Sequence, residues 1–232
     1  MIIALFKFKL QCQPYFLDKD ISAGVDLFNS ERDNTDESSF MSKRLGLGLR
    51  LGYEINEEWS QTLRYLIRRD EITEVSSDGS VFIRQQDGDT VTSLIGQDIV
   101  LDMRNSKFSP TDGFLVRGAT DIAGLGGDAK YFRAKLSSSV HYKIKKNWVL
   151  NFGGEINHIQ DMGEELRIND LFFLGGDNLR GFAVAGVGPR DSTTDDALGG
   201  RTLLTSTAEL HFPLGLPEEL GFSGALFTDI GT

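Results

Sequence analysis

Hydrophobic and polar residues alternate along most of this chain with a period of two. The clearest example is the segment 45–53, where the residues of one set are Leu45, Leu47, Leu49, Leu51 and Tyr53 and those of the other are Gly46, Gly48, Arg50 and Gly52. Successive side chains of a β-strand point to opposite faces, so these leucines share one face, whereas a helix would scatter them around its circumference. The pattern predicts a strand.

Runs of this kind follow one another along the chain. They lie near residues 4–13, 20–29, 41–54, 59–70, 93–104, 113–122, 129–143, 148–160, 202–213 and 220–230. The connections between them alternate between short and long, except that 123–128 is short where a long one is expected. Outer-membrane barrels have short periplasmic turns and longer outer loops. We therefore expect an all-β fold, a transmembrane antiparallel up-and-down β-barrel.

A soluble β-sandwich or lipocalin-like barrel would also show alternation, but its apolar face would lie inside. Here the polar face of successive strands carries Arg50, Arg64, Arg68, Glu155, Glu209 and Asp229. These charges face either bulk water or a wet lumen. Aromatic residues at the short turns, Tyr15, Phe16, Trp59 and Trp148, suit a membrane-interface girdle and favour the lumen.

Composition and charge exclude several other classes of protein and partner. Hydrophobic residues make up 40% of the chain, and no run approaches the roughly 20 apolar residues that a membrane helix needs. The net charge of −10 argues against a nucleic-acid partner, which requires a basic face. The single cysteine, Cys12, cannot form an internal disulfide. The apolar start of the chain, 1–10, is interrupted by lysines and is interpreted as a strand rather than a signal peptide.

The connection 161–201 is far longer than an ordinary loop, and loops of that length are usually functional or disordered. It is also unusually apolar, with Leu171, Phe172, Phe173, Leu174, Leu179, Phe182 and Val184. Such side chains must be buried somewhere. We expect the loop to fold back into the barrel lumen.

This loop carries a spaced motif, formed by Gly175, Gly176, Leu179, Arg180, Gly181 and Phe182 and followed by Gly188 and Pro189. It resembles the inward-folded sixth outer loop of the BamA family, the bacterial surface antigen barrels. Two other segments, 108–113 and 227–232, resemble a periplasmic turn and a late strand of that family. The resemblance implies a protein of the bacterial outer membrane that inserts and folds β-barrel proteins. Its implied partners are unfolded outer-membrane protein clients, outer-membrane lipid and the lipoproteins of an assembly complex.

The resemblance also implies partners for Arg180. In BamA-like barrels the loop arginine reaches acidic residues on two late strands, and the matching positions are Glu209 and Asp229. Both lie on the polar face of their strands, as the alternation requires. A planar guanidinium can bridge two carboxylates through several charge-assisted hydrogen bonds. Without the motif, the default would be three separately solvated charges.

Barrels of this family have about 16 strands, of which ten, or eleven if part of 182–200 pairs, can be recognised here. We therefore expect residues 1–232 to form a single barrel domain that is truncated at both ends and lacks the family's periplasmic POTRA domains. The seam strands would then be missing, and the fragment alone is not expected to insert clients.

Other functions find less support in the sequence. The histidines, His141, His158 and His211, form no metal-ligand spacing, and only His211 lies near an acid, Glu209. No Gly-x-Ser-x-Gly elbow and no phosphate-binding loop appears, so we expect no catalytic residue, no metal and no cofactor. The alternatives that stay open are a two-partner secretion transporter or a passive outer-membrane pore, and, more remotely, a soluble β-sandwich binding module.

Overall fold

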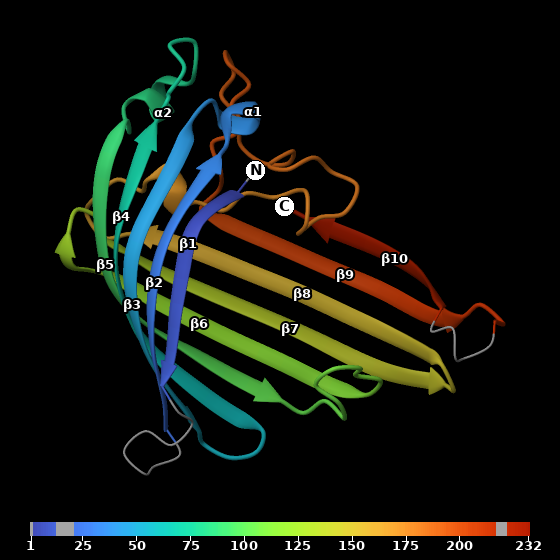
Figure 1. The fold of residues 1–232 in the computed structure, drawn as a ribbon. Coiled ribbons are helices and arrows are strands. Elements are labelled where there is room, and N and C mark those ends of the chain that lie inside the picture. Colours follow the sequence, from blue (N-terminus) through green and yellow to red (C-terminus); the bar gives the residue numbers. More distant parts are fainter. Residues whose placement is uncertain (1, 13–20, 217–221) are drawn as a thin grey trace.

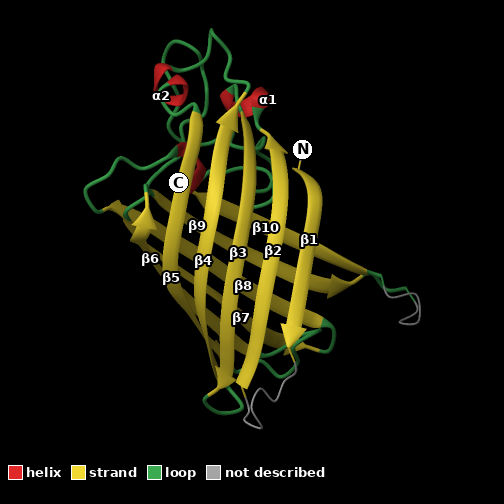
Figure 2. Cartoon of the chain, turned by 60° about the vertical axis from the view of Figure 1, so that its left-hand side comes forward, coloured by secondary structure: helices red, strands yellow, loops and turns green. Residues whose placement is uncertain are grey.

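The computed structural model describes residues 2–12, 21–216 and 222–232, and it shows one antiparallel sheet in which ten strands follow each other in chain order. The strands are β1 (Ile2–Cys12), β2 (Ile21–Asp33), β3 (Met41–Glu54), β4 (Trp59–Thr73), β5 (Gly88–Asp102), β6 (Gly113–Gly127), β7 (Tyr131–Lys145), β8 (Trp148–Asp161), β9 (Thr202–Pro213) and β10 (Ser223–Gly231). The sheet curves into an open barrel wall with β1 and β10 at its two edges (Figures 1 and 2). The predicted up-and-down meander is confirmed.

Among the described residues, helical structure lies on the side of the long connections. It consists of α1 (Thr35–Ser38), α2 (Val81–Arg84) and the 3-10 turn η2 (Ile168–Asp170). Among the described residues, no helix has the length and apolar character needed to cross a membrane. The segment 182–200, where an eleventh strand was possible, contains only isolated bridges, such as the pair Arg190 and Ala197. This segment therefore contains no eleventh strand.

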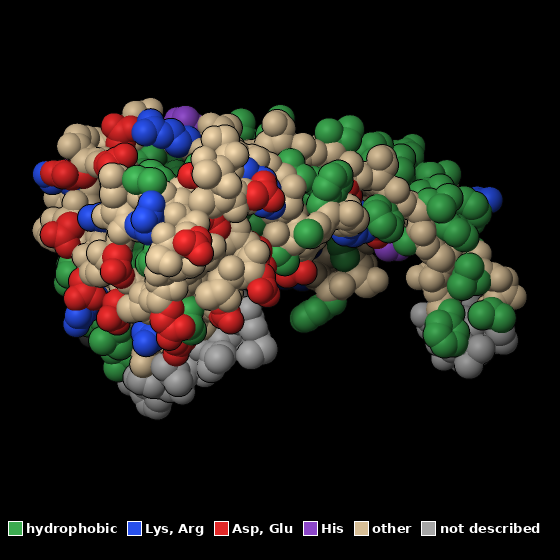
Figure 3. All heavy atoms as spheres, turned by 90° about the horizontal axis from the view of Figure 1, so that it is seen from above, with side chains coloured by type: hydrophobic (Ala, Val, Ile, Leu, Met, Phe, Trp, Pro, Cys, Tyr) green, Lys and Arg blue, Asp and Glu red, His purple; other side chains and the backbone are tan. Residues whose placement is uncertain are grey.

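The convex face of the sheet is apolar. Its exposed side chains include Leu27, Leu45, Leu49, Leu51, Leu63, Ile67, Ile95, Ile122, Leu136, Val140, Phe152, Ile156, Leu204 and Leu226. Seen from above, hydrophobic side chains gather along the outer side of the sheet, whereas charged side chains gather over the long connections (Figure 3). So large an apolar surface is unfavourable in water and matches the hydrocarbon of a bilayer.

The concave face is lined by paired charges. Arg64 forms ion pairs with Asp98 and with Asp121, and Arg133 lies 2.7 Å from the other oxygen of Asp121. Lumen-facing positions of neighbouring strands lie side by side in the register, so a cation on one strand meets an anion on the next. The predicted polar lumen is confirmed, and several of its charges are paired within the wall.

Two of the short turns are held by asparagine side chains. Asn56 accepts hydrogen bonds from the backbone N–H groups of Glu58 and Trp59, and Asn105 does the same for Thr111 and Asp112. Asparagine favours such turns because its side chain mimics a backbone acceptor. Trp59 and Trp148 each begin a strand directly after a short turn, as predicted, whereas Tyr15 and Phe16 lie outside the described residues.

Several strands extend beyond their predicted ends on the side of the long connections. β4 continues to Thr73, β5 begins at Gly88, and β6 continues to Gly127, so the connection predicted at 123–128 is shortened to 128–130. The added residues turn apolar side chains inward, where the loop 162–201 covers them. Two hydrophobic clusters form there. One contains Phe40, Ile72, Ile83 and Ile168, and the other contains Leu94, Ala123, Tyr131, Ile159 and Leu166.

Candidate functional site

The connection between β8 and β9, residues 162–201, lies against the concave face of the sheet (Figure 1). Its apolar residues fill the clusters there: Leu171 and Phe172 pack against the group around Leu94, and Phe173 packs against the group around Ile168. Burial of these side chains supplies the driving force that brings the loop into the lumen. We name this segment the lumenal loop.

The prediction of burial is wrong for two of the loop's apolar residues. Phe182 is 53% exposed and Val184 is 46% exposed. The backbone rather than the side chain of Phe182 serves the loop, because its carbonyl oxygen accepts a 2.9 Å hydrogen bond from the N–H of Gly176. Hydrophobicity indicates that a side chain favours burial, but it does not identify a residue whose main chain closes a turn.

The motif residues form a compact turn between Leu174 and Val187, which are joined by an isolated bridge. Gly175 donates its N–H to the side chain of Asn178 at 2.8 Å, and the amide of Asn178 donates to the carbonyl oxygen of Phe173 at 2.9 Å. Gly175 has φ +125°, a conformation that residues with a Cβ rarely adopt. The turn places Arg180 at its tip, facing β9 and β10.

Arg180 is held by two carboxylates on the barrel wall. Its Nη1 lies 2.6 Å from Glu209 Oε2, and its Nε lies 2.7 Å from Asp229 Oδ2. Its Nη2 also donates to Asp229 Oδ1 at 2.7 Å and to the hydroxyl of Thr207 at 2.9 Å. The contact with Asp229 is therefore bidentate, the geometry in which a guanidinium binds a carboxylate most strongly. The structure brings together all three residues that the sequence singled out.

Strand register explains why these partners converge. In the pairing of β9 with β10, Phe227 stands opposite Glu209 and Asp229 stands opposite Thr207. All four side chains face the lumen, and the guanidinium of Arg180 lies over the Phe227 ring at 3.6 Å from its centroid. A guanidinium is favourable on an aromatic face as well as between carboxylates. The site thus combines charge, hydrogen bonds and stacking on two adjacent strands.

A second group of loop contacts was not found from the sequence. Asp170, at the other end of the buried part of the loop, forms an ion pair with Arg68 of β4. The loop carbonyl of Asn169 accepts a 2.9 Å hydrogen bond from Arg44 of β3. The lumenal loop therefore contacts both sides of the concave face, at strands that are far apart in the sheet order.

The outer part of the lumenal loop joins the other long connections into a cap. Asp196 accepts hydrogen bonds from the Ser39 hydroxyl at 2.6 Å and from the Ser80 N–H at 2.7 Å. The Ser80 hydroxyl donates to Asp191 at 2.6 Å, and this bond, with the N–H of Thr193, lowers the pKa of the Asp191 carboxyl below its usual value. Three connections are thereby linked above the lumen.

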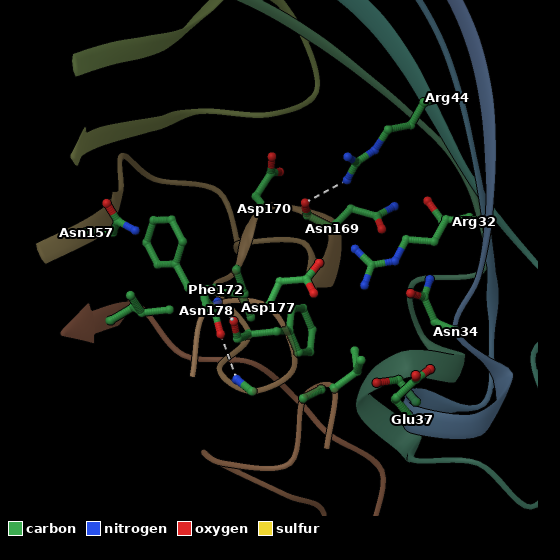
Figure 4. Close-up of a pocket in the computed structure, with 18 of the residues that line it drawn as sticks. Arg32, Asn34, Glu37, Arg44, Asn157, Asn169, Asp170, Phe172, Asp177 and Asn178 are labelled. Carbon is green, nitrogen blue, oxygen red and sulfur yellow. Dashed lines mark hydrogen bonds between the residues drawn. The ribbon is translucent and has the colours of Figure 1, made fainter. Parts of the chain in front are cut away.

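A cavity of about 610 Å³ lies between the lumenal loop and the wall (Figure 4). Charged and amide side chains from the loop and from several strands line it, among them Arg32, Arg44, Lys135, Asn157 and Asp177. Within the described part of the chain, no group of three or more histidine, cysteine or acidic residues could hold a metal ion.

His211 Nε2 lies 2.7 Å from Glu209 Oε1, so it contacts the same carboxylate that binds Arg180.

Replacing Gly175 with alanine is expected to open the turn that presents Arg180. A Cβ built on Gly175 would lie 2.0 Å from the carbonyl oxygen of Ala183, which is far inside van der Waals contact. A residue forced into this φ costs about 1–3 kcal/mol even before that clash is counted. We expect faster cleavage of residues 174–187 by added protease in isolated membranes.

Gly181→Ala is the matched control. Gly181 also has a positive φ, +89°, but a Cβ there would meet no atom within 4 Å. The strain is then limited to the backbone, and the loop should keep most of its protection. Equal sensitivity of both variants would show that the close approach of Gly175 to Ala183 is not what shapes the turn.

Comparison with known proteins agrees with this architecture. The family model of the Omp85 superfamily domain matches residues 7–232. The outer membrane protein assembly factor BamA of Neorickettsia risticii is 29% identical over 217 residues, which cover 93% of this chain and 29% of that protein. The sorting and assembly machinery component 50 homolog A of Xenopus laevis is 30% identical over 153 residues, which cover 64% of this chain and 32% of that protein.

The fold also matches a solved structure. The crystal structure of BamA from Haemophilus ducreyi lacking POTRA domains 1–3 superimposes with a TM-score of 0.86 at 20% identity, covering 97% of this chain and 48% of that one. The chain thus spans less than a third of the length of the BamA relative from Neorickettsia risticii. With its apolar convex face and polar lumen, it forms part of a β-barrel of the bacterial outer membrane, and it belongs to the Omp85 superfamily.

Proposed function

We propose that this chain supplies the barrel wall and the lumenal loop of a protein that inserts and folds other β-barrels in the bacterial outer membrane. The observation that carries the proposal is the contact of Arg180 with Glu209 and Asp229 inside a membrane barrel of the Omp85 superfamily. The names of its relatives support it, since two bacterial relatives are called outer membrane protein assembly factors.

The proposed reaction needs no catalytic side chain and no cofactor. A strand at a sheet edge has unpaired N–H and C=O groups, and these can bind and align a strand of an unfolded client. The lumenal loop would hold β9 and β10 at a fixed position, so that the complete barrel keeps its shape while such an edge is in use. Clients, outer-membrane lipid and the lipoproteins of an assembly complex are the proposed partners.

A test replaces the two carboxylates that bind Arg180 by their uncharged amides, Glu209→Gln and Asp229→Asn, in the full-length protein. Cells depleted of the wild-type protein are supplied with the variant, and folded client barrels are measured by their altered gel mobility before heating. We expect fewer folded clients at unchanged levels of the variant. Arg190→Ala is the control, because the partners of Arg190 in the described part of the chain, Ala185 and Asp195, both belong to the loop.

Normal client folding by the double variant, once its loop is shown to be released, would contradict the proposal. Loss of export of a single secreted protein, with client barrels unaffected, would instead identify a two-partner secretion transporter.

A further inference from the structure

Two arginines of β4 face the lumen four residues apart and have different partners. Arg64 binds Asp98 of β5 and Asp121 of β6, so it connects one wall strand to others. Arg68 binds Asp70 of its own strand and Asp170 of the lumenal loop, so it connects the wall to the loop. The two side chains lie on the same strand and the same face, and each has two carboxylate partners. They differ in whether one partner belongs to the loop.

The group around Arg68 is electrically balanced. Arg68 Nε lies 2.6 Å from Asp70 Oδ2, and the other oxygen of Asp70 lies 2.9 Å from Nε of Arg44. Arg44 then reaches the loop a second time, through its hydrogen bond to the carbonyl oxygen of Asn169 (Figure 4). Two arginines and two aspartates therefore meet where η2 contacts β3 and β4, and each has a partner of opposite charge.

Burial distinguishes this group from the contact of Arg180. The side chains of Arg68 and Asp170 are 9% and 3% exposed, whereas the Arg180 side chain is 38% exposed. A buried charge that loses its partner is strongly unfavourable, because its desolvation is no longer offset by an ion of opposite charge. If the loop leaves the wall at Asp170, Arg68 and Asp170 lose each other as partners. Packing adds to it, since the neighbouring Ile168 is fully buried against Phe40, Ile72 and Ile83.

We propose that Arg68 is a positioning residue which, with Asp70 and Asp170, forms a second anchor of the lumenal loop that acts independently of Arg180. The loop is then tied to β3 and β4 at one end of the segment 171–179 and to β9 and β10 at the other. Strands β5 to β8 lie between these two places in the sheet. The loop acts as a brace across the lumen and fixes how far the early and late strands stand apart.

Trypsin can report on the two anchors separately, because Arg167 lies three residues before Asp170 and Arg180 lies at the other anchor. The full-length protein in outer membranes is treated briefly with trypsin, and the cleavage sites are assigned from peptide masses. Where cleavage follows the population of an open loop, we expect Asp170→Asn and Arg68→Ala to raise cleavage after Arg167 roughly tenfold. Cleavage after Arg180 should rise by no more than about threefold.

Arg64→Ala is the matched control on the same face of β4. It removes an arginine whose ion-pair partners among the described residues, Asp98 and Asp121, both lie on wall strands. The substitution should lower the thermal stability of the barrel and leave cleavage after Arg167 within about twofold of wild type. Arg68→Lys keeps the charge without the planar fork and should restore part of the protection.

Three results would overturn the anchor. They are unchanged cleavage after Arg167 in Asp170→Asn, equal loop release by Arg64→Ala, and an equal rise at Arg167 and Arg180. If Arg68→Ala does not reach a folded barrel, Asp170→Asn decides alone, since it preserves the shape of the side chain. Any consequence for clients rests on the proposed function and is measured separately: a released loop with normal client folding contradicts that function and leaves the anchor standing.

Discussion

Replacing Arg180 with alanine is expected to release the tip of the lumenal loop while the barrel itself stays folded. The guanidinium is shared between Glu209 and Asp229, which come from adjacent strands, and it stacks on Phe227. Without it, two carboxylates face each other at the wall with no common cation, and the turn loses its only charged contact with β9 and β10 among the described residues.

Chymotrypsin cleavage after Phe182 measures this release, because Phe182 is already exposed and lies two residues from Arg180. We expect cleavage to accelerate by roughly tenfold or more if it follows the open population. Arg180→Lys should give an intermediate rate, since an ammonium cannot bind Asp229 in bidentate fashion. Arg190→Ala should resemble wild type. Wild-type protection in Arg180→Ala would show that the apolar packing alone holds the loop.

Placing a charge on the middle of the convex face is expected to destabilise the barrel in lipid. Leu49 is 45% exposed near the centre of β3, on the face that meets hydrocarbon. An arginine at the bilayer midplane of a β-barrel costs about 2–4 kcal/mol, whereas the cost falls to about 0–1 kcal/mol near the interface. Leu49→Arg should therefore lower the free energy of unfolding by about 2–4 kcal/mol.

Leu45→Arg is the control for depth. Leu45 shares the strand and the face but lies closer to the long connections. Unfolding of the full-length protein by denaturant in lipid vesicles should show a clearly larger loss for Leu49→Arg than for Leu45→Arg. Two equally mild substitutions would indicate that water, not lipid, contacts this face.

The strands could be predicted from the sequence because alternation directly reports which face a side chain occupies. The run from Leu45 to Tyr53 illustrates this, since its leucines all lie on the convex face or at its margin. The ends of the strands were less predictable. Gly88 and Asp89 have the composition of a turn, yet they pair with Ile72 and Glu71, because the wall continues past the membrane to meet the long connections.

The contact of Arg180 could be anticipated because a spaced motif and the parity of two strands agree on it. The contact of Asp170 with Arg68 could not, since these residues are 102 positions apart and alternation does not say which charges meet. One local signal was available. Asp170 precedes Leu171 and Phe172 in an apolar run that must be buried, and a buried carboxylate requires a cationic partner.

The central claim is that the lumenal loop lies inside the barrel against the last described strands. A cysteine pair tests it most directly, because a Cβ at Gly231 would lie 3.2 Å from Leu179 Cδ1. With Cys12 changed to serine, Leu179→Cys and Gly231→Cys in the full-length protein should form a disulfide in most folded molecules on mild oxidation of outer membranes. A folded barrel without that disulfide, whose Cys at 179 reacts with a membrane-impermeant maleimide, would contradict the claim.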